Sequence, residues 1–284
     1  MVGIALNVAF VAIEATFGVL SRSVALVADA AHNLSDVLGL AMAGGAYVLA
    51  QRTPSARRTY GLRKTTVLAA LANALFLMLA IGGVAWEAIG RIRNPTPVEG
   101  RTVMIVAAIG VVVNGVSATF FAKGHSHDVN VKGAYLHLLS DAAVSLGVVL
   151  TGLAISQTGW MWLDPVVSIA VSVVILAGTW GLLKQSLNLA LDAVPDGIDP
   201  GAVNAFLSTL PGVSEVHDLH IWAMSTTENA LTAHLVMTER DCAPGFLGTV
   251  CKELHDRFGI GHTTLQVEPP GAPDPCKQAP ADAL

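Results

Sequence analysis

The chain has 284 residues, of which 53% are hydrophobic and only 13% are charged. Its mean hydropathy of +0.59 lies outside the range of water-soluble globular proteins, so the composition predicts an integral membrane protein in contact with lipid. The formal net charge of −5 argues against a nucleic-acid partner, because such partners are bound by basic surfaces.

Six apolar segments are each close to the length of a helix that crosses the hydrocarbon core of a bilayer. They cover residues 3–20, 24–50, 66–89, 102–122, 133–155 and 163–183. The first segment has no basic N-terminal region and no A-x-A cleavage site, and it carries Glu14. We therefore interpret it as a membrane span rather than a signal peptide.

The loops on the two sides of the predicted bundle differ in positive charge. Eight Lys and Arg residues lie on one side, five of them in the loop of residues 51–64, and four lie on the other. The positive-inside rule places the more basic side, with both termini, in the cytosol. The short loops indicate a multi-pass protein of a bacterial inner (plasma) membrane.

After Lys184 the pattern becomes that of a small cytosolic domain. Residues 199–210 predict a short capped helix, 213–224 and 229–237 two strands, 244–258 an amphipathic helix and 262–269 a third strand. The order α-β-β-α-β predicts an α+β domain with its helices on one face of a sheet. We expect a transmembrane domain over 1–185, a cytosolic domain over 186–270 and a disordered tail over 271–284.

Two pentapeptides place ionisable side chains inside apolar spans: HNLSD at 32–36 and HLLSD at 137–141. Residues four apart share one helix face, so His32 points the same way as Asp36, and His137 the same way as Asp141. Ionisable groups are costly in the membrane and are functional candidates by default. Two imidazole nitrogens and two carboxylates form a four-coordinate shell suited to Zn²⁺.

Other interpretations of the polar residues stay open. Each His could instead hydrogen-bond its own Asp and hold helices together, although the duplicated motif favours a metal site. The span boundaries put the two pairs about 15 and 24 Å from the outer edge, so the metal site requires this difference in depth to be reconciled. Glu14 and Asp29 could serve proton transfer, helix pairing or a water-filled vestibule, and the HSHD segment at 125–128 could collect metal.

Several motifs resemble the zinc-transporting branch of the cation diffusion facilitator family. They are ALVADAAHNLSD, YGLRKTTVLAAL, NVKGAYLHLLSDAAVSLGVV, WLDPVVSIAVSVVIL and VHDLHIW, and the resemblance runs from about residue 7 to 268. It implies six transmembrane helices, a cytosolic ferredoxin-like domain and a homodimer. It also implies a secondary transporter that exports Zn²⁺, with Cd²⁺ and Co²⁺ as further candidates, from the cytosol in exchange for protons.

The resemblance assigns residues to two kinds of metal site. His32, Asp36, His137 and Asp141 stand at the family's transport site. The family's cytosolic zinc sites fall on His217, His234, His262 and Glu268. Zinc would then be both the transported substrate and a regulatory ligand.

The residues of the cytosolic domain leave two questions open. Strand alternation sends His217 and His220 to opposite faces unless a bulge intervenes, and we favour His217 as the ligand. The domain could also dimerise without binding metal, since His is common at protein surfaces.

Ligand chemistry suggests how transport would work. Zinc needs neutral His and ionised Asp, so protons and zinc compete for one site, which alternating access would expose to each side in turn. An intramembrane zinc metalloenzyme and a metal-sensing membrane protein are the alternatives. The chain has no H-E-x-x-H or Walker A sequence, and four protein ligands leave no position for an activated water, so we expect no enzyme activity.

Overall fold

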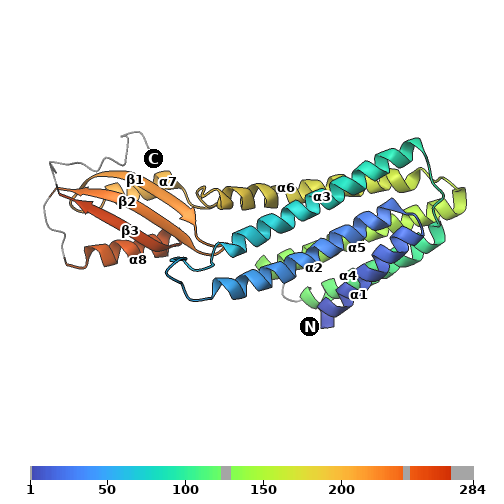
Figure 1. Ribbon diagram of the computed structural model, residues 1–284, viewed down its shortest axis with the longest axis horizontal. Helices are drawn as coiled ribbons and strands as arrows, with labels where there is room; N and C mark the ends of the chain where they lie inside the picture. The colour runs from blue at the N-terminus through green and yellow to red at the C-terminus, as the bar shows by residue number, and fades with distance from the viewer. Residues whose placement is uncertain (1, 123–128, 239–243, 270–284) are drawn as a thin grey trace. The chain divides into compact units, whose positions relative to one another are not determined.

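The computed structural model describes residues 2–122, 129–238 and 244–269. Six helices come first in the chain (Figure 1). They are α1 Val2–Leu20, α2 Val24–Ala50, α3 Thr65–Arg93, α4 Gly100–Phe121, α5 Val129–Thr158 and α6 Leu163–Ala190. Helices α2 to α6 each contain a stretch long and apolar enough to cross a membrane, and Asn7–Leu20 of α1 is a shorter apolar helix. The predicted tail and the HSHD segment lie outside the described residues.

The contacts divide the chain into two compact units. The first comprises Met1–Met42 and Ala72–Leu182, which is most of the helical bundle. The second comprises Ala43–Leu71 and Leu183–Leu284, so it joins the loop between α2 and α3 to the C-terminal domain.

Helices α4 and α5 approach each other closely through two glycines. A Cβ atom added to Gly100 would lie 2.6 Å from the carbonyl oxygen of Gly152, and one added to Gly152 would lie 2.7 Å from the backbone nitrogen of Met104. Only glycine permits this backbone contact, which is how small residues drive helix pairing where lipid removes the hydrophobic incentive. The pairing places α5, with its His and Asp, firmly against α4.

The first turn of α2 is anchored by a buried carboxylate from α6. Asp164 accepts hydrogen bonds from the Ser23 hydroxyl and, at 2.7 Å, from the backbone nitrogen of Val24. Free N–H groups at a helix start need such partners, above all where no water reaches them. Asp164 therefore holds the first turn of α2 against the start of α6.

The C-terminal domain has the predicted order of elements: α7 Pro200–Ser208, β1 Val213–Ala223, β2 Asn229–Met237, α8 Phe246–Phe258 and β3 Ile260–Glu268. The sheet order is β1-β2-β3, with β1 antiparallel and β3 parallel to β2. Asp199 caps α7 by accepting a hydrogen bond from Gly201 N at 2.9 Å, as the sequence indicated.

One core occupies one face of this sheet. Val203 and Leu207 of α7 and Val250 and Leu254 of α8 pack in a single cluster with the strands. Its central strand contributes alternate residues, Leu231, Ala233 and Leu235. Since neighbouring strand residues face opposite ways, His234 is directed to the other face, away from the helices.

Candidate metal centres

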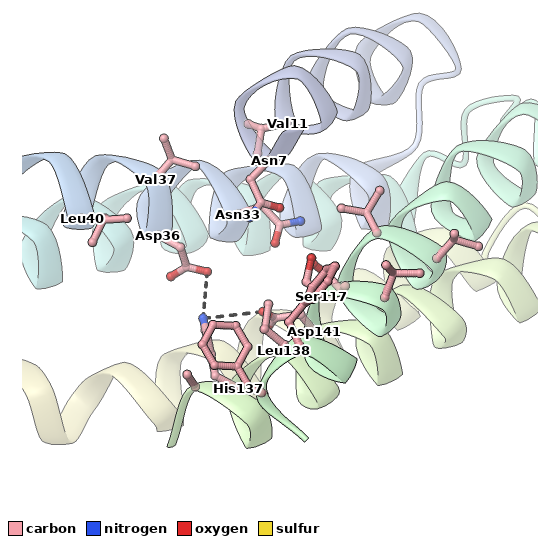
Figure 2. A pocket seen from close by; sticks show the side chains of 17 residues that line it. Asn7, Val11, Asn33, Asp36, Val37, Leu40, Ser117, His137, Leu138 and Asp141 are labelled. Carbon is pink, nitrogen blue, oxygen red and sulfur yellow. Dashed lines mark ion pairs between the residues drawn. The ribbon is translucent and has the colours of Figure 1, made fainter. Parts of the chain in front are cut away.

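The two His-x-x-x-Asp pairs lie against each other between α2 and α5. Within each helix the His Nε2 is close to its own carboxylate, at 3.7 Å for His32 and Asp36 and 3.5 Å for His137 and Asp141. Across the helices the distances are as short: 3.3 Å from His32 to Asp141 and 3.3 Å from His137 to Asp36. Figure 2 shows His137 between the two carboxylates. Imidazoles and carboxylates thus alternate around one point.

These spacings match the edges of a zinc coordination tetrahedron. Ligand atoms about 2.0–2.1 Å from a tetrahedral Zn²⁺ lie about 3.3–3.4 Å from one another. One ligand atom each from His32, His137 and Asp141 lies within 4.8 Å of the others, and Asp36 contacts both imidazoles. The expected difference in depth between the pairs does not keep them apart, because the side chains meet across the helix interface.

A cavity of about 930 Å³ leads to this cluster. Asp36, His137 and Asp141 line it among mainly apolar side chains of α1, α2, α4 and α5 (Figure 2). The lining also includes Phe121 and Ala134, which lie near the end of α4 and the start of α5. The cavity therefore runs from the cluster toward the end of the bundle where α4 is joined to α5.

Exposure differs among the four side chains. His137 is 47% exposed and Asp36 36%, whereas His32 is 15% and Asp141 6% exposed. An ion arriving through the cavity would meet Asp36 and His137 first. His32 and Asp141 form the inner side of the cluster.

A second polar cluster lies beside the metal cluster. It includes Asn33 and Ser145, whose hydrogen bonds to buried carboxylates the sequence did not predict. Asn33 Nδ2 donates a hydrogen bond to Glu14 Oε2 at 2.9 Å, and the Ser145 hydroxyl donates to Asp29 Oδ2 at 2.8 Å. All four residues are buried. Asn33 stands inside HNLSD and Ser145 one helical turn after Asp141, which is the only sequence signal for them.

Three of the four proposed cytosolic ligands meet on the face of the C-terminal sheet that α7 and α8 do not cover. His234 Nδ1 lies 2.9 Å from Glu268 Oε1, and His217 Nε2 lies 3.4 Å from Glu268 Oε2. The two imidazole centroids are 4.9 Å apart. Burial alone would raise the pKa of Glu268, but hydrogen bonds from His234 and His217 outweigh it and hold this pKa below its ordinary value. The trio is compact enough to hold a metal ion.

His262 lies elsewhere. It precedes Glu268 by six residues on β3, which is about 20 Å along a strand, and its ring contacts the ring of Tyr60 with centroids 5.6 Å apart. The structure therefore does not bring His262 to the other three. His262 and Glu268 share a face of the sheet but lie toward opposite ends of β3.

A bulge in β1 reshapes the region and brings in Asp218. His217 pairs with His234, and His220 pairs with Thr232. The chain therefore advances by three residues on β1 where it advances by two on β2. Asp218 sits in the bulge with a φ of 52°, and its carboxylate lies 3.5 Å from His234 Nε2 and 2.9 Å from His220 Nε2. Because this bulge lies between them, His217 and His220 are on the same face of the sheet. Only the Asp within VHDLH could have suggested this role.

Two family models cover nearly the whole sequence. "Cation efflux transmembrane domain" matches residues 1–189, and "Cation efflux protein, cytoplasmic domain" matches residues 195–270. The chain belongs to the cation diffusion facilitator family. The family predicted from the motifs is confirmed, and with it a membrane part of five to six apolar helices followed by a small α+β domain. Members of the cation diffusion facilitator family are metal cation transporters, so metal cation efflux is the class of activity.

Bacterial members of the cation diffusion facilitator family align over most of their length. The metal cation efflux system protein CzcD of Cupriavidus metallidurans is 37% identical over 99% of this chain and 88% of its own. The cadmium, cobalt and zinc/H(+)-K(+) antiporter of Bacillus subtilis is 33% identical over 91% of this chain and 85% of its own length. The zinc transporter ZitB of Escherichia coli is 36% identical over 91% of this chain and 83% of its own length. A solved structure, the metal-bound C-terminal domain of the C. metallidurans CzcD transporter, is 36% identical over 25% of this chain and 99% of that chain, with a TM-score of 0.23.

Proposed function

We propose that this protein exports Zn²⁺ from the cytosol in exchange for protons. The main support is the alternation of two imidazoles and two carboxylates beside a cavity within the helical bundle, with His Nε2 to Asp oxygen distances of 3.3 to 3.7 Å. The relatives named as a zinc transporter and as a cadmium, cobalt and zinc/H(+)-K(+) antiporter support it, with Cd²⁺ and Co²⁺ as additional cargo. The protein works as a homodimer in a bacterial inner membrane with both termini in the cytosol.

Exchange follows from competition for the same atoms. The His nitrogens bind zinc when neutral and the Asp oxygens when ionised, so binding displaces protons and protonation expels the metal. With the cavity open to the cytosol, Asp36 and His137 receive the ion and His32 and Asp141 complete its shell. Opening the same site to a more acidic outer side reverses the balance, as in alternating access.

The C-terminal domain binds a second zinc that regulates the carrier. Its proposed ligands are His217, His234 and Glu268, the trio whose ligand atoms lie within 4.8 Å of one another. His262 stands too far along β3 to join them within one subunit. The ionised carboxylate of Glu268 gives this site a fixed negative charge for a divalent ion.

The decisive test is zinc flux in proteoliposomes driven by a pH gradient. The wild type should move Zn²⁺ against the proton flow, and Asp36→Ala should reduce flux by at least about 100-fold, since it removes a ligand. A panel of Cd²⁺, Co²⁺ and Fe²⁺ defines the cargo, and His137→Asp, which adds a carboxylate, should broaden it. The antiport proposal fails if a zinc gradient moves no protons and a proton gradient moves no zinc.

The same experiment separates the alternatives. An intramembrane metalloenzyme would show loss of substrate cleavage in Asp36→Ala, with no flux in the wild type. A sensor would show no flux in either protein. Four groups at tetrahedral spacing already fill the coordination of a zinc ion, which disfavours a catalytic site with an open position.

A further inference from the structure

Glu14 of α1 and Asp29 of α2 are two carboxyl groups that zinc binding does not use. Both residues are completely buried, and their charges are close enough to interact. One oxygen of each is satisfied: Glu14 Oε2 by Asn33 and Asp29 Oδ2 by Ser145. The other two oxygens, Glu14 Oε1 and Asp29 Oδ1, have no hydrogen-bond donor among the described residues.

A single proton resolves this arrangement. Two neighbouring ionised carboxylates away from water repel each other and lose their hydration, which makes the doubly charged pair very unfavourable. A protonated carboxyl is a donor as well as an acceptor. The two carboxyl groups are within hydrogen-bond reach of each other, so one proton shared between them supplies the missing donor and leaves one negative charge on the pair.

The charged groups around the pair are few. Asp29 is influenced by His32 on its own helix and by Asp141 of α5. In α1, Glu14 is the only charged residue, and α4 carries only Arg101, in its first turn. Among the described helices that form this region, no cation contacts either carboxyl, so a proton is the available counter-charge.

The pair stands on the opposite side of the metal cluster from the cavity mouth. Glu14 is six residues from the end of α1 at Leu20, and Asp29 five residues from the start of α2 at Val24, which is about 8–9 Å of helix in each case. Asp36 lies about 18 Å from the same end of α2. This end of the bundle is the one remote from the loop between α2 and α3.

One residue connects the pair with the cavity. Asn33 lines the cavity and donates its amide hydrogen bond to Glu14 Oε2. A single side chain, Asn33, therefore separates the Glu14 carboxyl from the cavity.

We propose that Glu14 and Asp29 form a proton-binding site of their own, separate from the metal ligands, through which protons from the outer side pass during exchange. A proton from outer water forms an O–H bond with one carboxyl when the bundle opens outward. That bond breaks again when the cavity faces the cytosol, and the proton leaves to cavity water. This inference rests on the proposed zinc/proton exchange and identifies a second group that carries the proton.

The test compares proton-driven zinc flux with zinc/zinc exchange at equal pH in proteoliposomes. Net flux needs proton delivery, whereas exchange of labelled for unlabelled Zn²⁺ needs only the metal site. Glu14→Gln and Asp29→Asn keep size and hydrogen-bonding capacity but hold no titratable proton. Each should lower net flux by about tenfold or more, as expected for a lost proton-transfer group, while exchange and zinc binding change by less than about threefold.

Asp164→Asn is the matched control, because Asp164 is also a buried carboxylate but has both oxygens bonded, to Ser23 and to Val24 N. It should keep the wild-type ratio of net flux to exchange. The proposal is wrong if both pair variants keep wild-type net flux, or if exchange falls together with net flux, which indicates a structural role. It is also wrong if wild-type flux requires Na⁺ or K⁺ and the variants abolish only that requirement. Failure of the exchange function itself would appear in the wild type, as absence of proton-driven flux.

Discussion

At the scale of single residues, His234 shows how completely one side chain can be oriented. Its Nδ1 contacts Glu268 at 2.9 Å and its Nε2 faces Asp218 at 3.5 Å, so carboxylates stand on both sides of the ring. A carboxylate beside a ring nitrogen holds the orientation of the ring, as around zinc-binding histidines generally. Nδ1 is therefore the nitrogen on the side of Glu268 and the trio, and Asp218 lies on the other side of the ring.

The first prediction concerns Glu268. Glu268→Gln should weaken zinc binding to the C-terminal domain of the full-length protein by about 10- to 100-fold, because it removes the charged member of the trio. Isothermal titration with Asp36→Ala as background isolates this site. Because the pKa of Glu268 lies below its ordinary value, its carboxylate stays ionised as the pH falls from 7 to 5, so zinc lost in this window is lost through the imidazoles.

His262→Ala is the control for this prediction. His262 lies on the same face of the sheet but about 20 Å along β3, so its removal should leave the zinc affinity unchanged. An equal loss of affinity in both variants would contradict the assignment of the trio.

At the scale of elements, the contact between α4 and α5 holds the metal cluster in place. Gly100 and Gly152 bring the two backbones together, and Gly110 lies close enough that an added Cβ would be 3.1 Å from the Ser145 hydroxyl. Ser145 in turn contacts Asp29 of α2. The small residues along this interface thus position α5 relative to both polar clusters.

The second prediction tests this interface. Gly152→Ala should destabilise the protein by about 1–3 kcal/mol, because its Cβ meets backbone atoms that cannot yield without moving a helix. Gly147→Ala on the same helix has open space around its Cβ and should be neutral or gain up to about 1 kcal/mol from better helix propensity. Thermal unfolding of both detergent-solubilised variants measures the difference, and equal melting temperatures would rule out the tight contact.

At the scale of the whole molecule, the loop between α2 and α3 is tied to the C-terminal domain within the second unit. Lys64 forms an ion pair with Asp192, just after α6, and donates a 3.0 Å hydrogen bond to the carbonyl of Ala223 at the end of β1. Arg63 forms an ion pair with Glu228 at 2.7 Å. Because α3 begins directly after this junction, we expect a shift of the domain to act on the start of α3.

The third prediction follows from Lys64. Lys64→Met should slow zinc flux by up to about fivefold, the equivalent of the 1 kcal/mol expected for a partly exposed ion pair, without changing zinc affinity at the transport site. Arg57→Met removes an exposed cation from the same loop and should have no effect. Flux and binding measured on the same preparations check this. A fall in zinc affinity in Lys64→Met would mean that the residue acts on the site rather than on the movement.

The sequence by itself determined the features that depend on local periodicity. The length of apolar runs predicted the membrane helices, and the spacing of four put each His beside its own Asp. Alternation and turn residues predicted the order of elements in the C-terminal domain. These features follow from helix and strand geometry, which each segment carries within itself.

Only the tertiary structure decided which residues meet across elements. It set His32 against Asp141 and His137 against Asp36, and it placed the buried carboxyl groups of Glu14 and Asp29 close enough to interact. It also placed His262 at the wrong end of β3 for the cytosolic trio. The reason is physical: a segment's own pattern fixes the face on which a side chain lies, but helix packing, strand register and bulges fix what that face contacts.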